Sequence, residues 1–210
     1  MWSLLATAIE FPPYLHNVHD VKIKTNGLIV GLPHIFGFAM CIGFAIFLDR
    51  MIKTEVMSVT GARRLATVIG HLFSAMFILI LAYFGSGNIY VAVAMIVISS
   101  VLFGVGTIGC LANGMDISPN NSGTIMSIGR MVNVLTGFIC PVIIKYYTAE
   151  DPLNFIPVLN ITSIINIISG LGFCILGSGE VQHWDKPGNK ENVEENNELM
   201  YEKNKKNVNT

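Results

Sequence analysis

Charged residues are scarce in this chain: Asp, Glu, Lys and Arg make up 13% of it, whereas a soluble domain carries roughly a quarter. Apolar residues make up 52%, and most of the charges fall between long apolar runs. A water-soluble helical protein would instead show amphipathic helices, with apolar residues on one face. The composition therefore argues against a soluble globular fold.

The chain also lacks the clustered residues of metal sites, disulfide frameworks and common catalytic centres. It contains no His-Glu-x-x-His, no Gly-x-Ser-x-Gly and no paired intramembrane aspartates. The cysteines stand alone inside apolar runs and are expected to act as small packing residues; they are Cys41, Cys110, Cys140 and Cys174. We therefore expect no enzyme, no bound metal, no cofactor and no nucleic-acid partner.

Glycines recur inside the apolar runs. Gly104-Val-Gly-Thr-Ile-Gly matches a dinucleotide-binding pattern, but no strand precedes it. Close packing of neighbouring helices explains this string better, and we expect the same of Gly27-x-x-x-Gly31 and Gly170-Leu-Gly172.

Five apolar runs have roughly the 20 residues that a bilayer-crossing helix needs, at residues 28–48, 65–85, 89–112, 124–147 and 155–177. They predict an all-α, polytopic membrane helix bundle over residues 1–182. A further run at residues 2–11 has half this length, and Pro12-Pro13 is expected to end its helix. Because no Lys or Arg precedes Lys22, this run fits a truncated transmembrane helix better than a signal peptide.

Basic residues in the connections predict the orientation. The segment after the first full span holds the most Lys and Arg of any connection, namely Arg50, Lys53, Arg63 and Arg64, so it is predicted to be cytoplasmic. Alternation of the spans then puts the C-terminus on the same side. The tail at 183–210 is rich in Asn, Glu and Lys and is predicted to be disordered. The sequence fits the plasma membrane and a vesicular or lysosomal membrane equally.

Several strings resemble one family of transporters. Glu10-Phe-Pro-Pro-Tyr-Leu and Asn26-Gly-Leu-Ile-Val-Gly-Leu-Pro resemble its seventh-helix exit and eighth-helix entry. Three further regions follow in family order: Ser58-Val-Thr with Arg63-Arg64-Leu, the string from Asn113 to Ser127, and Gly177-Ser-Gly-Glu-Val-Gln-His-Trp. The family is the anion transporters of the major facilitator superfamily, which includes sodium–phosphate cotransporters, sialin, vesicular glutamate transporters and insect inorganic phosphate cotransporters.

The resemblance implies the C-terminal six-helix half of a major facilitator fold, with its first helix truncated. In such transporters two halves rock around a substrate site near the bilayer midplane. It therefore implies a symporter for inorganic phosphate or organic anions, coupled to Na⁺ or H⁺, of which this chain is an incomplete part. The alternative is a non-transporting half-protein that binds a full-length paralogue. The implied partners are the lipid bilayer, a small anion, and a missing N-terminal half or a paralogue that supplies it.

Ionisable side chains inside spans are costly, so they are the first candidates for substrate or coupling-ion binding. Arg130 could bind an anion in bidentate fashion, or its side chain could extend to the nearby cytoplasmic interface. Glu10 matches the family's Glu-x-Pro-x-Tyr string and could bind a coupling ion, or it could be solvated near the outer interface.

Three further polar residues inside spans are candidates for the same site. His71 could relay protons, since histidine titrates near neutral pH, or it could simply hydrogen-bond a neighbouring helix. His34 follows Pro33, which interrupts the helix backbone near a potential cavity. Asn133, one turn after Arg130, could serve the same cavity face or hold helices together.

A second set of residues is predicted to gate or to stabilise the cytoplasmic end. The family often shows Asn-His-x-Asp where this chain has Asn113-Gly-Met-Asp116, so a role of that histidine in proton coupling does not carry over. We expect Asp116 to cap the next helix or to pair with Arg63 or Arg64. Pro119, Gly123 and Glu180 complete this set.

Overall fold

The computed structural model describes residues 2–185, with side chains from Leu5 onward, as an all-α bundle. Its α-helices are α1 (Trp2–His19), α2 (Ile23–Lys53), α3 (Val59–Val68), α4 (Ser74–Phe84), α5 (Ile89–Ile117), α6 (Ser122–Thr148) and α7 (Ile156–Leu176). A π-helical segment, Ile69–Phe73, joins α3 to α4, and a 3-10 turn, Gly85–Gly87, follows α4. Residues 186–210, which hold most of the predicted disordered tail, lie outside the described residues.

Five helices in the described range are long and apolar enough to cross a membrane: Ile23–Lys53, Val59–Gly87, Ile89–Ile117, Ser122–Thr148 and Ile156–Leu176. They match the five predicted runs. The first four helices extend beyond their runs by a few residues at one or both ends, and the last starts and ends one residue inside its run. The protein is therefore an integral, multi-pass membrane protein, and the prediction of an all-α membrane bundle is confirmed.

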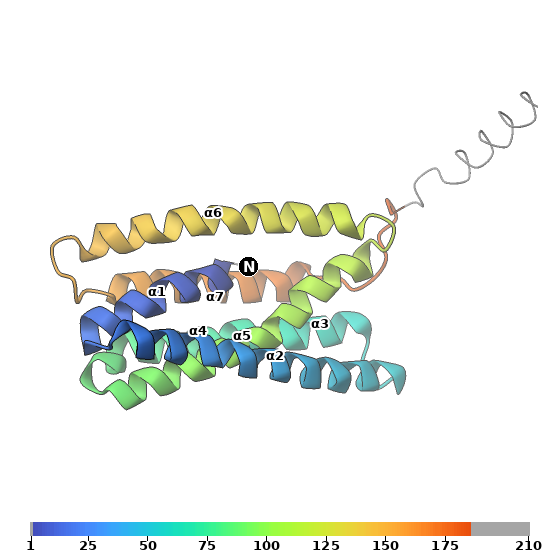
Figure 1. Cartoon of the computed structure of the whole chain (residues 1–210). Coiled ribbons are helices and arrows are strands. Elements are labelled where there is room, and N and C mark those ends of the chain that lie inside the picture. The colour runs from blue at the N-terminus through green and yellow to red at the C-terminus, as the bar shows by residue number, and fades with distance from the viewer. Residues whose placement is uncertain (1, 186–210) are drawn as a thin grey trace, which may run out of the picture.

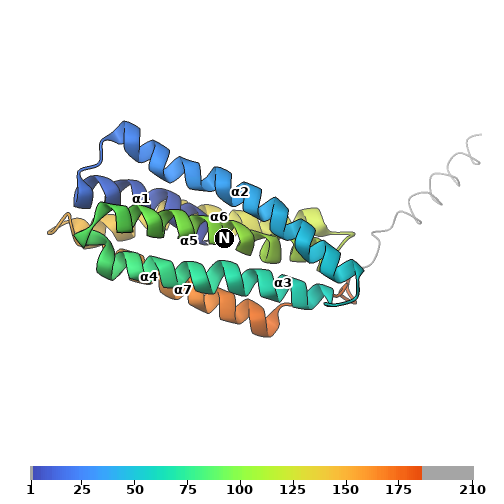
Figure 2. The same cartoon turned by 90° about the horizontal axis from the view of Figure 1, so that it is seen from below.

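The helices run side by side, and their connections gather at two ends (Figures 1 and 2). One end holds the α1–α2, α4–α5 and α6–α7 connections. The opposite end holds the α2–α3 and α5–α6 connections and the segment that follows α7. The helix α1 begins near the middle of the bundle's length and runs to the first of these ends (Figure 1), and its residue Glu10 is buried.

The prediction that Pro12-Pro13 ends the first helix is wrong, because both prolines lie inside α1. Proline lacks the N–H that would bond the carbonyl four residues earlier, but packing of neighbouring helices can hold a transmembrane helix through such a gap. Here Phe11, Tyr14 and Leu15 are buried on both sides of the proline pair and anchor the helix.

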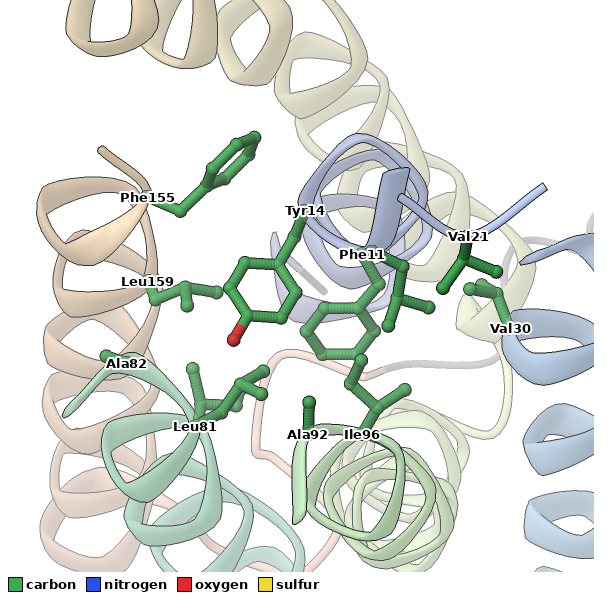
Figure 3. Packing of buried hydrophobic residues seen from close by; sticks show 12 residues of the cluster. Phe11, Tyr14, Val21, Val30, Leu81, Ala82, Ala92, Ile96, Phe155 and Leu159 are labelled. Atoms are coloured by element: carbon green, nitrogen blue, oxygen red, sulfur yellow. The ribbon is translucent and has the colours of Figure 1, made fainter. Parts of the chain in front are cut away.

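The larger of two apolar clusters lies where α1 meets α4, α5 and α7. Figure 3 shows Phe11 and Tyr14 of α1 projecting toward Leu81, Ile96 and Leu159. A smaller cluster lies toward the opposite end, around Leu48, Ala62, Ala66 and Ile108. The helices α1, α4, α5 and α7 thus form a packed unit, and this unit positions Glu10.

Glycines set the closest helix crossings. A Cβ built on Gly70 would meet the backbone of Gly106, and one built on Gly104 would lie 2.7 Å from the carbonyl oxygen of Gly37. Close packing is therefore confirmed for the Gly104–Gly109 string, as it is for Gly170, which faces His71 and Leu72. The prediction of close packing is wrong for three other glycines, because a Cβ built on them meets no atom within 4 Å: Gly27, Gly31 and Gly172.

Candidate functional site

Glu10 is buried at a junction of three helices. Its side chain is 2% exposed, and its Oε1 atom accepts a hydrogen bond from the Thr162 hydroxyl of α7 at 2.6 Å. The Cys140 thiol of α6 donates to the same oxygen at 3.7 Å. The expectation that Glu10 could be solvated near an interface is therefore wrong, because helix α1 continues past Pro12-Pro13 and packs this face inward.

Further polar side chains extend the junction along each helix. Thr7 precedes Glu10 on α1 by one turn, Thr136 precedes Cys140 on α6, and Asn166 follows Thr162 on α7. All three are buried. Residues three or four apart share one face of a helix, so these side chains continue the polar faces on which Glu10, Cys140 and Thr162 lie. We call the six residues Thr7, Glu10, Thr136, Cys140, Thr162 and Asn166 the polar junction.

The second carboxyl oxygen of Glu10 has no partner. Oε2 is shielded from solvent and accepts no hydrogen bond from the described residues. An isolated carboxylate in such a site is unfavourable unless a proton or a cation neutralises it. Among the described residues no group of three or more His, Cys, Asp or Glu side chains could hold a metal ion. The polar junction thus holds a buried carboxyl group whose negative charge, when ionised, no neighbouring described residue balances.

Arg130 does not join this junction. It is exposed on α6 and makes no hydrogen bond or ion pair with the described residues. It lies ten residues before Cys140, about 15 Å along a helix. Asn133, one turn on, is half-buried, and its Oδ1 atom has no hydrogen-bond partner in the described part of the chain. Arg130 therefore places a guanidinium on the face of α6 that the bundle leaves open, whereas the Oδ1 atom of Asn133 is shielded from solvent.

The two histidines occupy different environments. His71 is buried in the π-helical segment, its Nδ1 lies 3.2 Å from the Thr67 carbonyl oxygen, and its ring packs against Phe103. The predicted hydrogen bond to a neighbouring helix is thus replaced by one within its own span. His34 is exposed and lines a small hollow of about 220 Å³ between α2 and α5, beside Cys41 and Thr107. Neither histidine contacts Glu10.

The predicted pairing of Asp116 is present. The Arg63 Nε atom donates to Asp116 Oδ2 at 2.6 Å, and Arg63 Nη2 lies 3.4 Å from Oδ1. Asp116 lies in the last turn of α5 and does not cap α6. Arg64 instead donates two hydrogen bonds to the Gly177 carbonyl oxygen, which ties α3 to the end of α7.

Residues 177–185 form a strap across this end of the bundle. The Gly179 N–H donates to Thr60 Oγ1, and the Gln182 N–H donates to the Ile117 carbonyl oxygen. Glu180 is exposed on the strap, and Pro119 and Gly123 are exposed at the α5–α6 turn. Asn113 lines an open groove of about 560 Å³ between α5, α7 and the strap. The residues predicted to gate this end are therefore gathered here, apart from the polar junction.

Asp185 fastens the strap to the α5–α6 turn. Its carboxylate accepts hydrogen bonds from Ser118 Oγ at 2.6 Å, from Asn121 Nδ2 at 2.9 Å, and from the Asn120 side chain and backbone N–H. Burial raises the pKa of Asp185, but these hydrogen bonds outweigh it and leave the pKa below its ordinary value. The predicted tail begins at His183, so its third residue, Asp185, is fixed to the bundle.

Three contributors were not identified from the sequence as functional residues: Cys140, Thr162 and Asp185. The four cysteines are free thiols, as predicted, but Cys140 contacts Glu10 and does more than fill space. Thr162 and Asn166 are also polar residues inside an apolar run, so the sequence held a signal that could have identified them. Asp185 carried no such signal, because it stands in a polar segment.

Comparison with known proteins finds transporters with similar sequences. No family model matches the sequence. The chain is 27% identical to human sodium-dependent phosphate transport protein 4 over 186 residues, which cover 88% of this chain and 44% of that protein. It is 26% identical to human sialin over 184 residues, covering 87% and 37%. It is 28% identical to bovine vesicular glutamate transporter 1 over 191 residues, covering 89% and 33%.

These relatives are members of the anion-transporter family that the strings resemble, so the predicted resemblance is confirmed over most of the chain. They are membrane transporters, not enzymes. The chain spans less than half the length of each of these relatives.

Proposed function

We propose that this chain forms the C-terminal half of a secondary active transporter that moves inorganic phosphate or a small organic anion together with a coupling ion. The similarity to anion transporters supports the transport of an anion. The observation that carries the coupling is Glu10, a buried carboxyl whose Oε2 has no partner among the described residues. A carboxyl group held in this way inside a membrane bundle is suited to load and release an ion.

The open faces of α2 and α6 support the second part of this proposal. In their most apolar windows 17% and 11% of residues are buried, against 50% in Val59–Gly87 and 44% in α5. An N-terminal six-helix half would cover these faces, and the substrate would bind between the two halves. Arg130 and Asn133 would then face the substrate, with the guanidinium pairing with the anion.

The charge distribution supports an orientation with the strap inside the cell. Arg50, Lys53, Arg63 and Arg64 all lie at the end of the bundle that carries the strap. Lys22, Lys24 and Lys145 lie toward the other end. Short connections rich in Lys and Arg stay on the cytoplasmic side, so the C-terminus would be cytoplasmic.

Uptake of radiolabelled phosphate or an organic anion into proteoliposomes tests the proposal. The complete gene product should take up an anion under an imposed proton or sodium gradient. Arg130→Ala should lower uptake at least about tenfold, since a charged hydrogen bond is worth about 1.5–3 kcal/mol. Glu10→Gln should abolish the response to the gradient. Lys145→Ala, an exposed cation on the same helix, is the control and should transport normally.

A non-transporting half-protein is the second candidate, favoured by the same uncovered faces of α2 and α6. This reading expects no uptake with any gradient, and it expects the chain to co-purify with a full-length relative whose transport it lowers. Normal uptake by both Arg130→Ala and Glu10→Gln would contradict the site assignment, whichever candidate holds.

A further inference from the structure

We propose that the polar junction is a proton site: Glu10 carries the coupling proton on Oε2, and Thr162 and Cys140 hold its other oxygen. The inference rests on the proposed symport and names its coupling ion as H⁺ in place of Na⁺. Three features of the junction support it, namely the distribution of hydrogen bonds over the carboxyl group, the surrounding charges, and the nature of the nearby ligands.

The hydrogen bonds divide the two oxygens as a protonated carboxylic acid would. Both protein donors, the Thr162 hydroxyl and the Cys140 thiol, approach Oε1. Oε2 accepts nothing from the described residues and is shielded from solvent. A protonated carboxyl group has one acceptor oxygen and one O–H donor, whereas an ionised one has two oxygens that both require donors. We therefore assign Oε1 as the carbonyl oxygen and Oε2 as the hydroxyl, which finds no acceptor among the described residues.

The surrounding helices supply no compensating positive charge. Glu10 makes no ion pair with the described residues, although α1 packs against α2, α5, α6 and α7. Cys140 is the titratable group on these helices that contacts it. The others are Tyr14, His16 and His19 on α1; Lys24, His34, Cys41, Asp49, Arg50 and Lys53 on α2; Tyr90, Cys110 and Asp116 on α5; Arg130, Lys145, Tyr146 and Tyr147 on α6; and Cys174 on α7. An unpaired carboxylate in this setting is most easily neutralised by a proton.

The ligands argue against a hard cation. Such cations take several oxygen ligands at once, and thiols are ligands for soft metals. Here a sulfur atom occupies one of the two positions around Oε1. The Thr162 hydroxyl donates its proton to Glu10 at 2.6 Å, so only its lone pairs remain to meet a cation.

The proton balance of the cycle is simple. A proton from one side of the membrane binds the carboxylate at Oε2 and neutralises it; on the other side the O–H bond ionises and the proton leaves to water, which restores the carboxylate. Nothing is oxidised or reduced. Because Oε2 is shielded in this structure, each exchange requires a movement of the helices that pack against α1, which couples proton release to helix motion.

Infrared spectroscopy of the complete gene product in lipid nanodiscs tests the proton. At neutral pH in sodium-free buffer, the protein should show the carbonyl stretch of a protonated carboxylic acid, shifted in D₂O. Glu10→Gln should remove the band, and Glu150→Gln, an exposed carboxyl in the α6–α7 connection, should leave it. Thr162→Val retains Glu10 and removes one hydrogen bond to Oε1, so its band should move to higher frequency, as expected of a less hydrogen-bonded carbonyl.

The outcomes separate this inference from the proposed function. A wild-type band that is absent, that survives Glu10→Gln, or that sodium chloride replaces by a carboxylate signal would overturn the proton site, even if anion uptake is intact. If Glu10→Gln fails to fold, the frequency shift of the carbonyl band in Thr162→Val tests whether that band belongs to Glu10. A band assigned to Glu10 in a protein that takes up no anion would support the proton site and overturn the transporter.

Discussion

Two carboxyl groups of this bundle have opposite environments, one in its interior and one at the end that carries the strap. Asp185 is surrounded by donors from Ser118, Asn120 and Asn121, while Glu10 has donors at one oxygen alone. Donors favour the ionised form of a carboxyl group, and burial without donors favours the neutral form. Asp185 is thus ionised and holds the strap in place.

The strap should come loose in acid. The pKa of Asp185 is lower in the folded protein than its ordinary value of 3.8, so its stabilising effect is complete above 3.8 and disappears as pH falls through the lower folded value. The emission of Trp184, next to Asp185, reports this in a Trp2→Phe background. We expect a red shift below about pH 4.

Asp185→Asn should show that shift already at neutral pH, because it removes the charge that the four donors bind. Glu150 is exposed, so the control variant Glu150→Gln should show the same Trp184 emission as the parent protein. Identical emission of Asp185→Asn and the parent from neutral to acid pH would mean that the strap does not depend on this carboxylate.

At the scale of the helices, small residues decide how closely α5 approaches its neighbours. Gly104 lies against Gly37 of α2, and Gly106 lies against Gly70 of the Val59–Gly87 span. Because no side chain separates the backbones there, the two contacts hold α5 between α2 and that span. His71 of that span packs against Gly106 of α5 and Gly170 of α7, so glycine makes room for a buried histidine ring.

Gly70→Ala should destabilise the bundle by about 1–3 kcal/mol, the usual cost of an added group in a close-packed core. Its Cβ would collide with the backbone of Gly106, which cannot rotate away. Gly172→Ala is the matched control: its Cβ meets open space, and alanine favours a helix by about 1 kcal/mol over glycine. Denaturant unfolding in detergent measures both. Equal stability of the two variants would show that the crossing can relax.

At the scale of the whole molecule, charge separates the two ends of the bundle. The end with the strap carries the arginines of the α2–α3 region, one of which is held by Asp116. Positive charges near short connections resist translocation, so this distribution predicts that the strap and the C-terminus face the cytoplasm.

An antibody against residues 189–210 should therefore label cells after permeabilisation and not before. A tag in the α6–α7 connection, at residues 149–154, should label intact cells if the protein is in the plasma membrane, and the lumen of vesicles if it is not. Asn120 lies in an Asn-Asn-Ser sequon at the strap end. A glycan on Asn120 would reverse the orientation.

Composition and the lengths of apolar runs determined the five spans and their alternation, because a bilayer requires about 20 apolar residues whatever their neighbours. The strings around Asp116 and Glu180 resemble those of anion transporters. Charge was enough to predict Arg63 as one candidate partner of Asp116, beside Arg64 and a cap of the next helix. The continuation of α1 through Pro12-Pro13 needed tertiary packing, because a proline's effect depends on what surrounds the freed carbonyls. The polar junction needed it too: Glu10, Cys140 and Thr162 are distant in the chain, and only the fold places their helices together and excludes water from them.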